Sequence, residues 1–449
     1  MRVHFISIGG SVMHQLAIAL KKKGSTVTGS DDEIFEPAAT NLKNENLLPS
    51  ENGWHPELIT PETDAVILGM HAKEDNPELK KAKELGLKIY SFPEYIFLES
   101  LHKKRIAVGG SHGKTTTTAM IMHVLKTLNF HFDYLVGASL KGFEQSVKIT
   151  DAPVIVCEAD EYPASAIEKK PKFHFLFPHI AVITGIAWDH INVFPTFEFY
   201  LEQFIIFVNK IEKNGILIYN ETDQVLKKLV ESHRRDDISY APYHLPEHTI
   251  DEGKTIVTIG NTGSTLKVFG NHNLLNLQAA WLVCKELNIS EKAFAGAISD
   301  FEGAAKRLQW IGSKNDGNIY RDFAHAPSKV KASIDAVKEQ FPDKKLIAIL
   351  ELHTFSSLNK EFMNEYGGAM ANADEAIVFY SHHALELKRM NFLEPALVKQ
   401  GFKKENLVVI NERQELEEKL RQYDLKNANY LFMSSGNYDG MNILTTLNI

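Results

Sequence analysis

The chain contains 449 residues, of which 44% are hydrophobic and 24% are charged, and its formal net charge at pH 7 is -8. At roughly 150 residues per domain this length suggests about three domains, and the composition is that of a globular protein. The acidic balance argues against a nucleic-acid partner, which would need a basic face, and no apolar stretch approaches the roughly 18 residues that would favour membrane insertion.

The cysteine content and the N-terminal segment both bear on the cellular compartment. Only Cys157 and Cys284 are present, which excludes a disulfide framework and a zinc site built from several cysteines. The first residues form a short apolar run that ends in Gly9 and Gly10, so we interpret them as a first strand entering a turn and not as a signal peptide. We therefore expect a cytoplasmic protein.

The first hundred residues predict a parallel α/β unit. Apolar, β-rich segments alternate there with segments of helical spacing, with strands expected at 3–8, 26–29, 65–68 and 87–90 and helices at 13–22 and 77–85. Strands that alternate with helices indicate βαβ units and a doubly wound, Rossmann-like sheet.

Two further α/β units follow along the chain. The second begins after the charged link 103–105, and its apolar strands are expected at 106–108, 154–157 and 180–184, with a helix at 115–127. It is followed by a strand-like stretch at 251–269 and a helix at 274–287. A third unit starts near Arg307, with strands at 318–323, 346–350, 375–379, 407–410 and 430–433. We predict an α/β fold of three domains, with bounds of 1–102, 103–306 and 307–449.

The segment Gly109–Thr118 carries the strongest functional signal. A predicted strand leads into its sequence GGSHGKTTTT and a predicted helix leaves it. Glycines let backbone N–H groups surround phosphate oxygens, and the helix N-terminus adds partial positive charge. In such a loop Lys114 would contact the β- and γ-phosphates and the Thr115 hydroxyl would bind Mg²⁺. Val108 stands where the full G-x-x-x-x-G-K-[ST] pattern has its first glycine, but the shorter G-x-x-G-K-T still predicts nucleotide binding.

Polar residues follow two neighbouring predicted strands. Glu158-Ala159-Asp160-Glu161 comes directly after the strand at 154–157, and Mg²⁺ prefers one or two carboxylates together with phosphate oxygens. A solvated acidic loop is the alternative. Asp189-His190 lies beyond the strand at 180–184, where His190 could bind a second cation or pack against Trp188. Two such strand ends beside one phosphate loop favour a metal–nucleotide site.

Further polar residues lie near predicted domain boundaries. Asn273 and Asn276 are spaced by one helical turn and could contact a base, position a domain or cap a helix. Asp322-Phe323-Ala324-His325-Ala326-Pro327 ends another strand. Arg307 lies at the expected hinge, where it could meet phosphates after the third domain closes or remain solvated.

Five of these segments, in this order and spacing, resemble the motifs of the Mur ligases of peptidoglycan synthesis. The family patterns are G-T-H-G-K-T-T, E-A-D-E, D-H, G-x-H-N-x-x-N and D-[DYF]-A-H-x-P, and they are matched at Gly110–Thr116, Glu158–Glu161, Asp189-His190, Gly270–Asn276 and Asp322–Pro327. The resemblance covers the whole chain. It implies an N-terminal Rossmann-like domain for a UDP-sugar, a central P-loop ATPase domain and a C-terminal Rossmann-like domain for the incoming amine.

The resemblance also implies an ATP- and Mg²⁺-dependent ligase with roles for particular residues. Catalytic roles fall on Lys114, His190 and His325, and metal-binding roles on Thr115, Glu158 and His190. The residues implied to bind ATP are Gly110, Ser111, His112, Gly113, Lys114, Thr115, Thr116, Asn273, Asn276, Arg307 and Asp322. Those implied to bind the UDP-sugar are Gly9, Gly10, Ser30, Asp31 and His71.

Within the family, the likeness is nearest to the branch that recycles murein peptides. That branch joins L-alanyl-γ-D-glutamyl-meso-diaminopimelate to UDP-N-acetylmuramate through an acyl phosphate. Tyr162 after E-A-D-E, where the alanine-adding branch usually has serine, and the sequence of 433–436 support this assignment.

Three positions in the amine-binding domain depart from the recycling pattern. Ala326 replaces a second histidine, Glu351-Leu352-His353-Thr354 replaces E-P-R-S, and Asn437-Tyr438-Asp439-Gly440 replaces G-F-G-G. UDP-N-acetylmuramate–L-alanine ligase therefore stays open as an alternative. An NAD-dependent oxidoreductase is disfavoured because the first turn has no G-x-G-x-x-G, and a binding module without catalysis would bind ATP but release no ADP.

Overall fold

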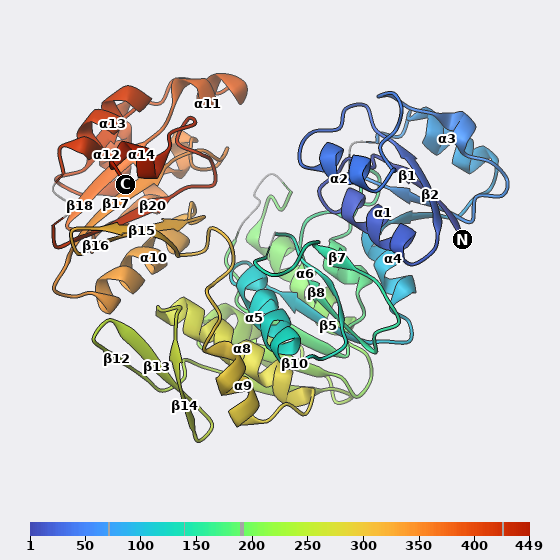
Figure 1. The fold of residues 1–449 in the computed structure, drawn as a ribbon, viewed down its shortest axis with the longest axis horizontal. Coiled ribbons are helices and arrows are strands. Elements are labelled where there is room, and N and C mark those ends of the chain that lie inside the picture. The colour runs from blue at the N-terminus through green and yellow to red at the C-terminus, as the bar shows by residue number, and fades with distance from the viewer. Residues whose placement is uncertain (71, 139, 189–192, 424–425) are drawn as a thin grey trace. The chain divides into compact units, whose positions relative to one another are not determined.

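The computed structural model describes residues 1–70, 72–138, 140–188, 193–423 and 426–449. The described chain divides into two compact units, of which the first comprises Met1–His244 and Leu275–Ala297 and the second comprises Leu245–Leu274 and Ile298–Ile449. Four separate sheets run through these units (Figure 1). None of the described helices is both long and apolar enough to cross a membrane.

The first sheet is parallel and has the strand order β2-β1-β3-β4. Its strands are β1 (Arg2–Ile6), β2 (Thr26–Ser30), β3 (Ala65–Leu68) and β4 (Ile89–Ser91), and its helices are α1 (Met13–Lys22), α2 (Ala38–Asn44), η1 (Pro56–Leu58), α3 (Pro77–Glu84) and α4 (Phe92–Glu99). The predicted helix at 13–22 is confirmed. The strand predicted at 3–8 ends earlier, because Ser7 has a positive φ of 70° that turns the chain away from the sheet.

The second sheet has the order β11-β10-β9-β5-β8-β6-β7 and is parallel except for its edge strand β7. Its strands are β5 (Lys104–Gly109), β6 (Asp133–Leu135), β7 (Val147–Lys148), β8 (Val154–Glu158), β9 (Ile180–Ile183), β10 (Ile216–Asn220) and β11 (Ser239–Tyr243). The associated helices are α5 (Lys114–Thr127), η2 (Lys172–Phe175), α6 (Phe197–Asn209) and α7 (Gln224–Ser232), and α8 (Asn271–Glu286) and α9 (Glu291–Ile298) come later in the chain. Strand β5 lies between β8 and β9, at the position where strand order reverses and where α/β sheets bind ligands.

The strand-like stretch at 251–269 forms part of a small antiparallel sheet. Its strands are β12 (His248–Asp251), β13 (Lys254–Ile259) and β14 (Thr262–Leu266). Every second residue of β13 is buried, as expected for a sheet with one covered face. Helix α10 (Pro327–Gln340) contacts that sheet, since the Thr255 hydroxyl donates to Gln340 Oε1 at 2.9 Å.

The fourth sheet has the order β15-β16-β20-β17-β18-β19 and is parallel except for the edge strand β15. Its strands are β15 (Gln309–Lys314), β16 (Gly317–Asp322), β17 (Lys345–Glu351), β18 (Glu375–Phe379), β19 (Val408–Ile410) and β20 (Ala428–Met433). Besides α10, its helices are η3 (Lys360–Tyr366), α11 (His382–Leu387), α12 (Pro395–Phe402), α13 (Arg413–Arg421) and α14 (Ile443–Thr446). The parallel α/β architecture predicted from the sequence is confirmed.

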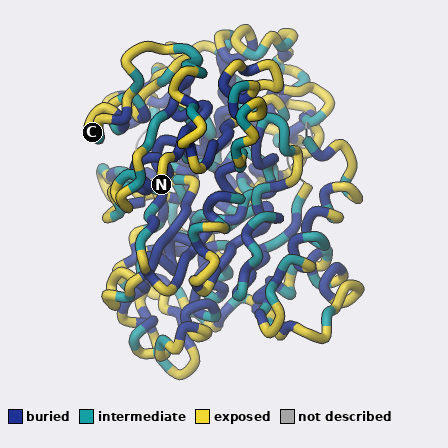
Figure 2. Tube along the Cα trace, turned by 90° about the vertical axis from the view of Figure 1, so that its right-hand side faces the viewer, coloured by how far each residue is buried: buried dark blue, intermediate teal, exposed yellow. Residues whose placement is uncertain are grey.

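Buried residues follow the strands of these sheets, and exposed residues gather in the loops between elements (Figure 2). In the core of the second sheet, His174 stacks on Phe173, with ring centroids 4.9 Å apart, and its Nε2 lies 2.9 Å from the Gln203 carbonyl oxygen. Burial lowers the pKa of His174 to about 4. The ring is therefore neutral in the folded protein at neutral pH.

This buried histidine predicts a loss of stability in acid. Because its folded pKa of about 4 lies below the ordinary value of 6.5, the unfolded state binds more protons between these pH values. The contribution of His174 to stability is thus fully present above about pH 6.5. As the pH drops from there towards 4, the free energy of unfolding falls by up to about 1.4 kcal/mol per pH unit. Urea unfolding is measured for the wild type and for His174→Gln across this pH range. The free energy of unfolding should depend less steeply on pH in the variant. His131→Gln, the same change at an exposed histidine, should show the pH dependence of the wild type. Equal pH dependence of the free energy of unfolding in all three proteins would contradict the prediction.

Candidate functional site

The phosphate loop predicted from the sequence connects β5 to α5 at the strand-order switch of the second sheet. Gly110 and Gly113 both have positive φ, of 124° and 85°. A Cβ at Gly110 would lie 2.2 Å from Thr184 Oγ1 and 2.9 Å from the Thr184 backbone nitrogen. The Thr184 hydroxyl also donates to the carbonyl oxygens of Gly109 and His112. Only glycine permits this close approach of the loop to the residue that follows β9.

The first residue of α5 places an ammonium group over this loop. Lys114 Nζ donates to the Gly110 carbonyl at 2.7 Å and to Glu161 Oε2 at 2.6 Å. Burial lowers the pKa of Lys114, but the charges of Glu161 and Asp160 raise it by more, so the pKa lies above its ordinary value. The side chain is therefore a cation, held where the loop pattern predicts a phosphate.

An oxygen pair lies beside the ammonium. The Thr115 hydroxyl donates to Glu158 Oε1 at 2.6 Å, and Glu158 Oε2 accepts the Gly137 N–H at 2.8 Å. A hydroxyl and a carboxylate are the oxygen ligands that Mg²⁺ takes beside phosphate oxygens and water, so these two residues fit the predicted cation. Over the described residues, no group of three His, Cys, Asp or Glu side chains is arranged to hold a metal. Asp189 and His190, the predicted second contact, lie outside the described residues.

A buried tyrosine that the sequence analysis missed holds this cluster together. The Tyr200 hydroxyl, on α6, lies 2.8 Å from Ser111 Oγ and donates to Glu161 Oε1 at 3.3 Å. Ser111 Oγ also accepts the Ala187 N–H at 2.9 Å. Tyrosine is common on apolar helices, so no sequence signal distinguishes this one from a core residue.

The remaining predicted ATP-binding residues of the first unit lie against the same loop. Thr116 is buried in the first turn of α5. Asn276 Oδ1 accepts the Thr117 hydroxyl at 3.2 Å and would be 2.3 Å from a Cβ placed on Gly113. The structure thus brings Asn276 to the phosphate loop. In the second unit, Asn273 Nδ2 donates to the Phe269 carbonyl at 2.9 Å.

In the first sheet, Asp31 and Ser30 hold the turn that contains Gly9 and Gly10. The Gly9 N–H donates to Asp31 Oδ2 at 2.8 Å, and the Ser30 carbonyl accepts the N–H groups of Ser7 and Ile8 at 3.0 Å each. Both Ser30 and Asp31 are buried. These four predicted residues therefore form one structure at the carboxyl edge of β1 and β2. His71, predicted to accompany them, lies outside the described residues.

In the second unit, Arg307 and His325 both contact one aromatic ring, that of Phe323. The Arg307 guanidinium carbon is 4.8 Å from the centre of the Phe323 ring, and the His325 ring meets Phe323 edge-on at 5.4 Å. His325 Nδ1 lies 2.8 Å from the Phe323 carbonyl oxygen. Asp322, by contrast, is buried and accepts the Ser333 hydroxyl. The Asp322 carboxylate therefore makes an internal contact between β16 and α10.

Two of the three segments that depart from the recycling pattern, 351–354 and 437–440, meet at the ends of β17 and β20. Glu351 is buried, and its Oε2 accepts the Ser434 hydroxyl and, at 2.8 Å, the Tyr438 N–H. His353 Nδ1 lies 3.8 Å from Glu351 Oε1, and a Cβ on Gly436 would be 2.8 Å from that ring. Ala326 precedes α10.

A polar cavity of about 450 Å³ lies in the same unit, beyond the ends of β18 and β19. Basic and acidic side chains both line it, and its lining consists of Ser381, His382, His383, Asn411, Glu412, Arg413, Gln414, Glu417 and Asp439. Such a lining suits a ligand that carries both an amino group and a carboxylate.

Three family models match the chain in succession. The model described as "Mur ligase family, catalytic domain" matches residues 2–98, "Mur ligase middle domain" matches 108–284, and "Mur ligase, glutamate ligase domain" matches 306–436.

Known proteins match along most of the chain. It is 33% identical to UDP-N-acetylmuramate–L-alanine ligase of Caldicellulosiruptor bescii, over 83% of this chain and 82% of that protein. Two solved structures share its fold at lower identity. A murein peptide ligase from Psychrobacter arcticus has a TM-score of 0.64 at 22% identity, covering 100% of this chain and 99% of that one. A UDP-N-acetylmuramate–alanine ligase from Thermotoga maritima has a TM-score of 0.69 at 21% identity, covering 100% and 97%.

Proposed function

Because this chain belongs to the Mur ligase family of ATP-dependent, amide-forming ligases, we propose that it joins UDP-N-acetylmuramate to L-alanyl-γ-D-glutamyl-meso-diaminopimelate. The products would be the amide, ADP and phosphate, as in peptidoglycan recycling. The observation that carries the proposal is the phosphate loop, with Lys114, Thr115 and Glu158 gathered at the switch point of the second sheet. The proposal also includes the domain bounds predicted at 102 and 306 and a cytoplasmic location.

The proposed reaction has two steps. A lactyl carboxylate oxygen attacks the γ-phosphorus of ATP, ADP leaves, and an acyl phosphate forms. The amine nitrogen then attacks the acyl carbon and loses a proton, and phosphate departs from the tetrahedral intermediate. The Lys114 ammonium neutralises the charge on the transferring phosphoryl group. Mg²⁺ held by Thr115 and Glu158 would supply further charge neutralisation at the phosphate oxygens.

The other predicted residues take supporting parts in the proposal. His190 would complete the cation site, and the turn at Gly9 and Gly10, with Ser30, Asp31 and His71, would receive the UDP-sugar. Asn273, Asn276, Arg307 and Asp322 belong to the predicted nucleotide contacts, with Asp322 acting through the fold around it. His325 would position either the amine or the adenosine.

Two features support a peptide as the incoming amine. The polar cavity beyond β18 and β19 offers both charge signs and, at about 450 Å³, has room for the diaminopimelate end of a peptide. Tyr162 also follows E-A-D-E, where the alanine-adding branch usually has serine. The second candidate is UDP-N-acetylmuramate–L-alanine ligase, because the 33% identical relative carries that name.

The two candidates differ in which amine supports ADP release. Purified protein is incubated with ATP, Mg²⁺ and UDP-N-acetylmuramate, and the tripeptide or L-alanine is added. Turnover with the tripeptide alone is the expected result. Turnover with L-alanine alone would transfer the protein to the alanine-adding branch, and release with neither amine would refute both assignments.

Glu158 provides a test of the cation site. Glu158→Gln should raise the Mg²⁺ concentration needed for half-maximal ADP release by about tenfold or more, because a neutral amide replaces the charged ligand. The measurement is a Mg²⁺ titration at saturating ATP. Glu168→Gln, in which the same chemical change is made at a partly exposed side chain outside the phosphate loop, should titrate like the wild type. Equal Mg²⁺ requirements for Glu158→Gln and the wild type would remove Glu158 from the proposed cation site.

A further inference from the structure

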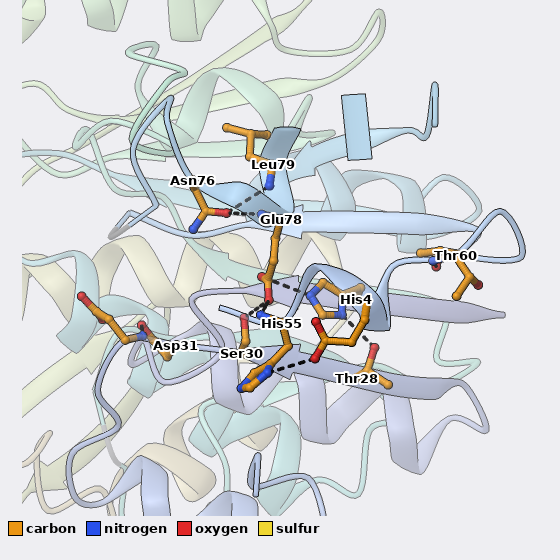
Figure 3. Close-up of polar contacts among 12 residues, drawn as sticks. His4, Thr28, Ser30, Asp31, His55, Thr60, Asn76, Glu78 and Leu79 are labelled. Atoms are coloured by element: carbon orange, nitrogen blue, oxygen red, sulfur yellow. Dashed lines mark hydrogen bonds and ion pairs between the residues drawn. The ribbon is translucent and has the colours of Figure 1, made fainter. Parts of the chain in front are cut away.

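A buried carboxylate lies on a helix that packs against the first sheet, outside all the motifs described above. Glu78, in the first turn of α3, is completely buried. Its Oε1 accepts the Ser30 hydroxyl and the His55 backbone N–H, each at 2.5 Å, and its Oε2 lies 3.3 Å from His4 Nε2. His4 Nδ1 in turn lies 2.8 Å from Thr28 Oγ1. Figure 3 shows Ser30 and His4 directed at the Glu78 carboxylate, with Thr28 beside the far nitrogen of His4.

Stability alone is a weak reason for such a group. Burial raises the pKa of the Glu78 carboxyl, but contacts with His4, Ser30 and the His55 N–H lower it by more, so the group is ionised at neutral pH. A buried charge with its partners often contributes no more to folding than apolar side chains of the same volume. A role in holding particular segments in place accounts better for the arrangement.

The segments that Glu78 holds meet at the turn after β1. Ser30, whose hydroxyl Glu78 fixes, accepts the Ser7 and Ile8 N–H groups with its carbonyl oxygen. The next residue, Asp31, accepts the Gly9 N–H with its side chain, and its carbonyl accepts the Gly53 N–H at 2.7 Å. Glu78 therefore secures the end of β2 directly and, through His55, the loop that contains Gly53.

This turn has the features of an anion-binding site. It links β1 to the 10-residue helix α1, and β1 lies between β2 and β3, where the strand order of the first sheet reverses. Ligands of α/β sheets bind at such a reversal, and backbone N–H groups at a helix start favour phosphate. The buried polar network ends at this turn.

We propose that Glu78 is a positioning residue for the UDP-sugar, whose carboxylate fixes the end of β2 and the loop before η1 so that the turn at Gly9 and Gly10 is preformed for the diphosphate. The inference rests on the proposed function, because that function names the ligand. Glu78 acts on the turn through Ser30 and His55, whose donor groups its carboxylate accepts.

The test compares Glu78→Gln with Glu84→Gln, the same chemical change at an exposed position of the same helix. In Glu78→Gln the amide nitrogen can no longer accept a hydrogen bond. If it takes the place of Oε1, Ser30 and His55 both lose their acceptor, and if it takes the place of Oε2, His4 loses its partner. Binding of UDP-N-acetylmuramate is measured by calorimetry, and the KM values for the UDP-sugar and ATP by ADP release. Glu78→Gln should weaken UDP-sugar binding and raise its KM by about tenfold, with kcat and the KM for ATP within about twofold of the wild type. Glu84→Gln should match the wild type throughout.

The remaining outcomes separate the two ideas. Wild-type UDP-sugar binding in Glu78→Gln would overturn the positioning role. Equal losses in ATP and UDP-sugar affinity, with a lowered midpoint of thermal unfolding, would make Glu78 a folding residue only. Ser30→Ala, which removes one contact and leaves the carboxylate, should reproduce a several-fold loss of UDP-sugar affinity alone, and wild-type affinity there would also count against the proposal. If the wild-type protein itself binds no UDP-sugar, the result would instead contradict the proposed function.

Discussion

Lys114→Ala should reduce ATP-dependent turnover by at least about a thousandfold, because the only cation that the phosphate loop itself supplies disappears from the transferring phosphoryl group. The substitution also leaves Glu161, a buried carboxylate, without its 2.6 Å ammonium partner, which adds a second penalty at the same position. Binding of UDP-N-acetylmuramate, assigned to the first sheet, should remain within about twofold of the wild type.

The measurements for this variant are ADP release at saturating substrates and calorimetry with the UDP-sugar. Lys126→Ala is the matched control, because Lys126 lies in the last turn of the same helix α5 and its ammonium contacts the loop carbonyl of Gly142 and the Phe143 ring. That control should retain turnover. Substantial turnover by Lys114→Ala would mean that the loop does not hold the reacting phosphate.

Gly110→Ala should abolish nucleotide binding and destabilise the first unit by about 2 kcal/mol or more. At its φ of 124° an L-residue is strained, and the new Cβ would lie 2.2 Å from the Thr184 hydroxyl oxygen and 2.9 Å from its backbone nitrogen. The backbone neighbour cannot rotate away, so either the loop or the end of β9 must shift. Either displacement removes the N–H groups that the loop presents to phosphate.

Calorimetry with ATP and urea unfolding together test the glycine. Gly296→Ala serves as the control, because Gly296 lies within helix α9 and a Cβ there would meet nothing within 4 Å. That change should leave ATP binding intact and should stabilise the protein by up to about 1 kcal/mol. A Gly110→Ala protein with normal ATP affinity would show that the close approach to Thr184 is not required.

The elements that the sequence predicted well are those with one clear periodicity. The helix at 13–22 and the strands at 65–68 and 375–379 have the bounds that were expected, because a continuous apolar run or a helical apolar stripe defines each of them. Strand β15 was not predicted. It is an edge strand that pairs only with β16 and leaves most of its residues exposed or half-buried, so its sequence has no regular pattern.

The candidate site divides in the same way. Lys114, Thr115 and Glu158 were found because local sequence, a glycine-rich turn and a strand end, determines where they lie. Tyr200 and Glu78 were not, because their partners come from distant segments: His4 and Glu78 are 74 residues apart. In the sequence, Glu78 follows Asn76 and Pro77 at a helix start, where a glutamate is ordinarily a solvated residue that favours the helix N-terminus.

The amine-binding domain shows why substrate choice is hard to infer from substitutions alone. The sequence places Asn437–Gly440 where the recycling branch has a glycine-rich segment. In the structure Tyr438 is buried there, and its hydroxyl donates to the carbonyl oxygens of Ile349 and Met433 at 3.0 and 2.9 Å. At least one substituted residue, Tyr438, thus stabilises the ends of β17 and β20 from inside the fold. A substitution in this segment therefore need not change a contact with the amine.

The central claim is that the carboxylate of the UDP-sugar is activated by phosphorylation. The most direct test uses UDP-N-acetylmuramate labelled with oxygen-18 in both lactyl carboxylate oxygens, together with ATP and the amine that supports ADP release. If an acyl phosphate forms, one labelled oxygen remains in the amide and the other leaves with phosphate, so mass spectrometry should find one oxygen-18 in each phosphate released. Amide formation with unlabelled phosphate would contradict the mechanism, because the carboxylate oxygen would then never have been bonded to phosphorus.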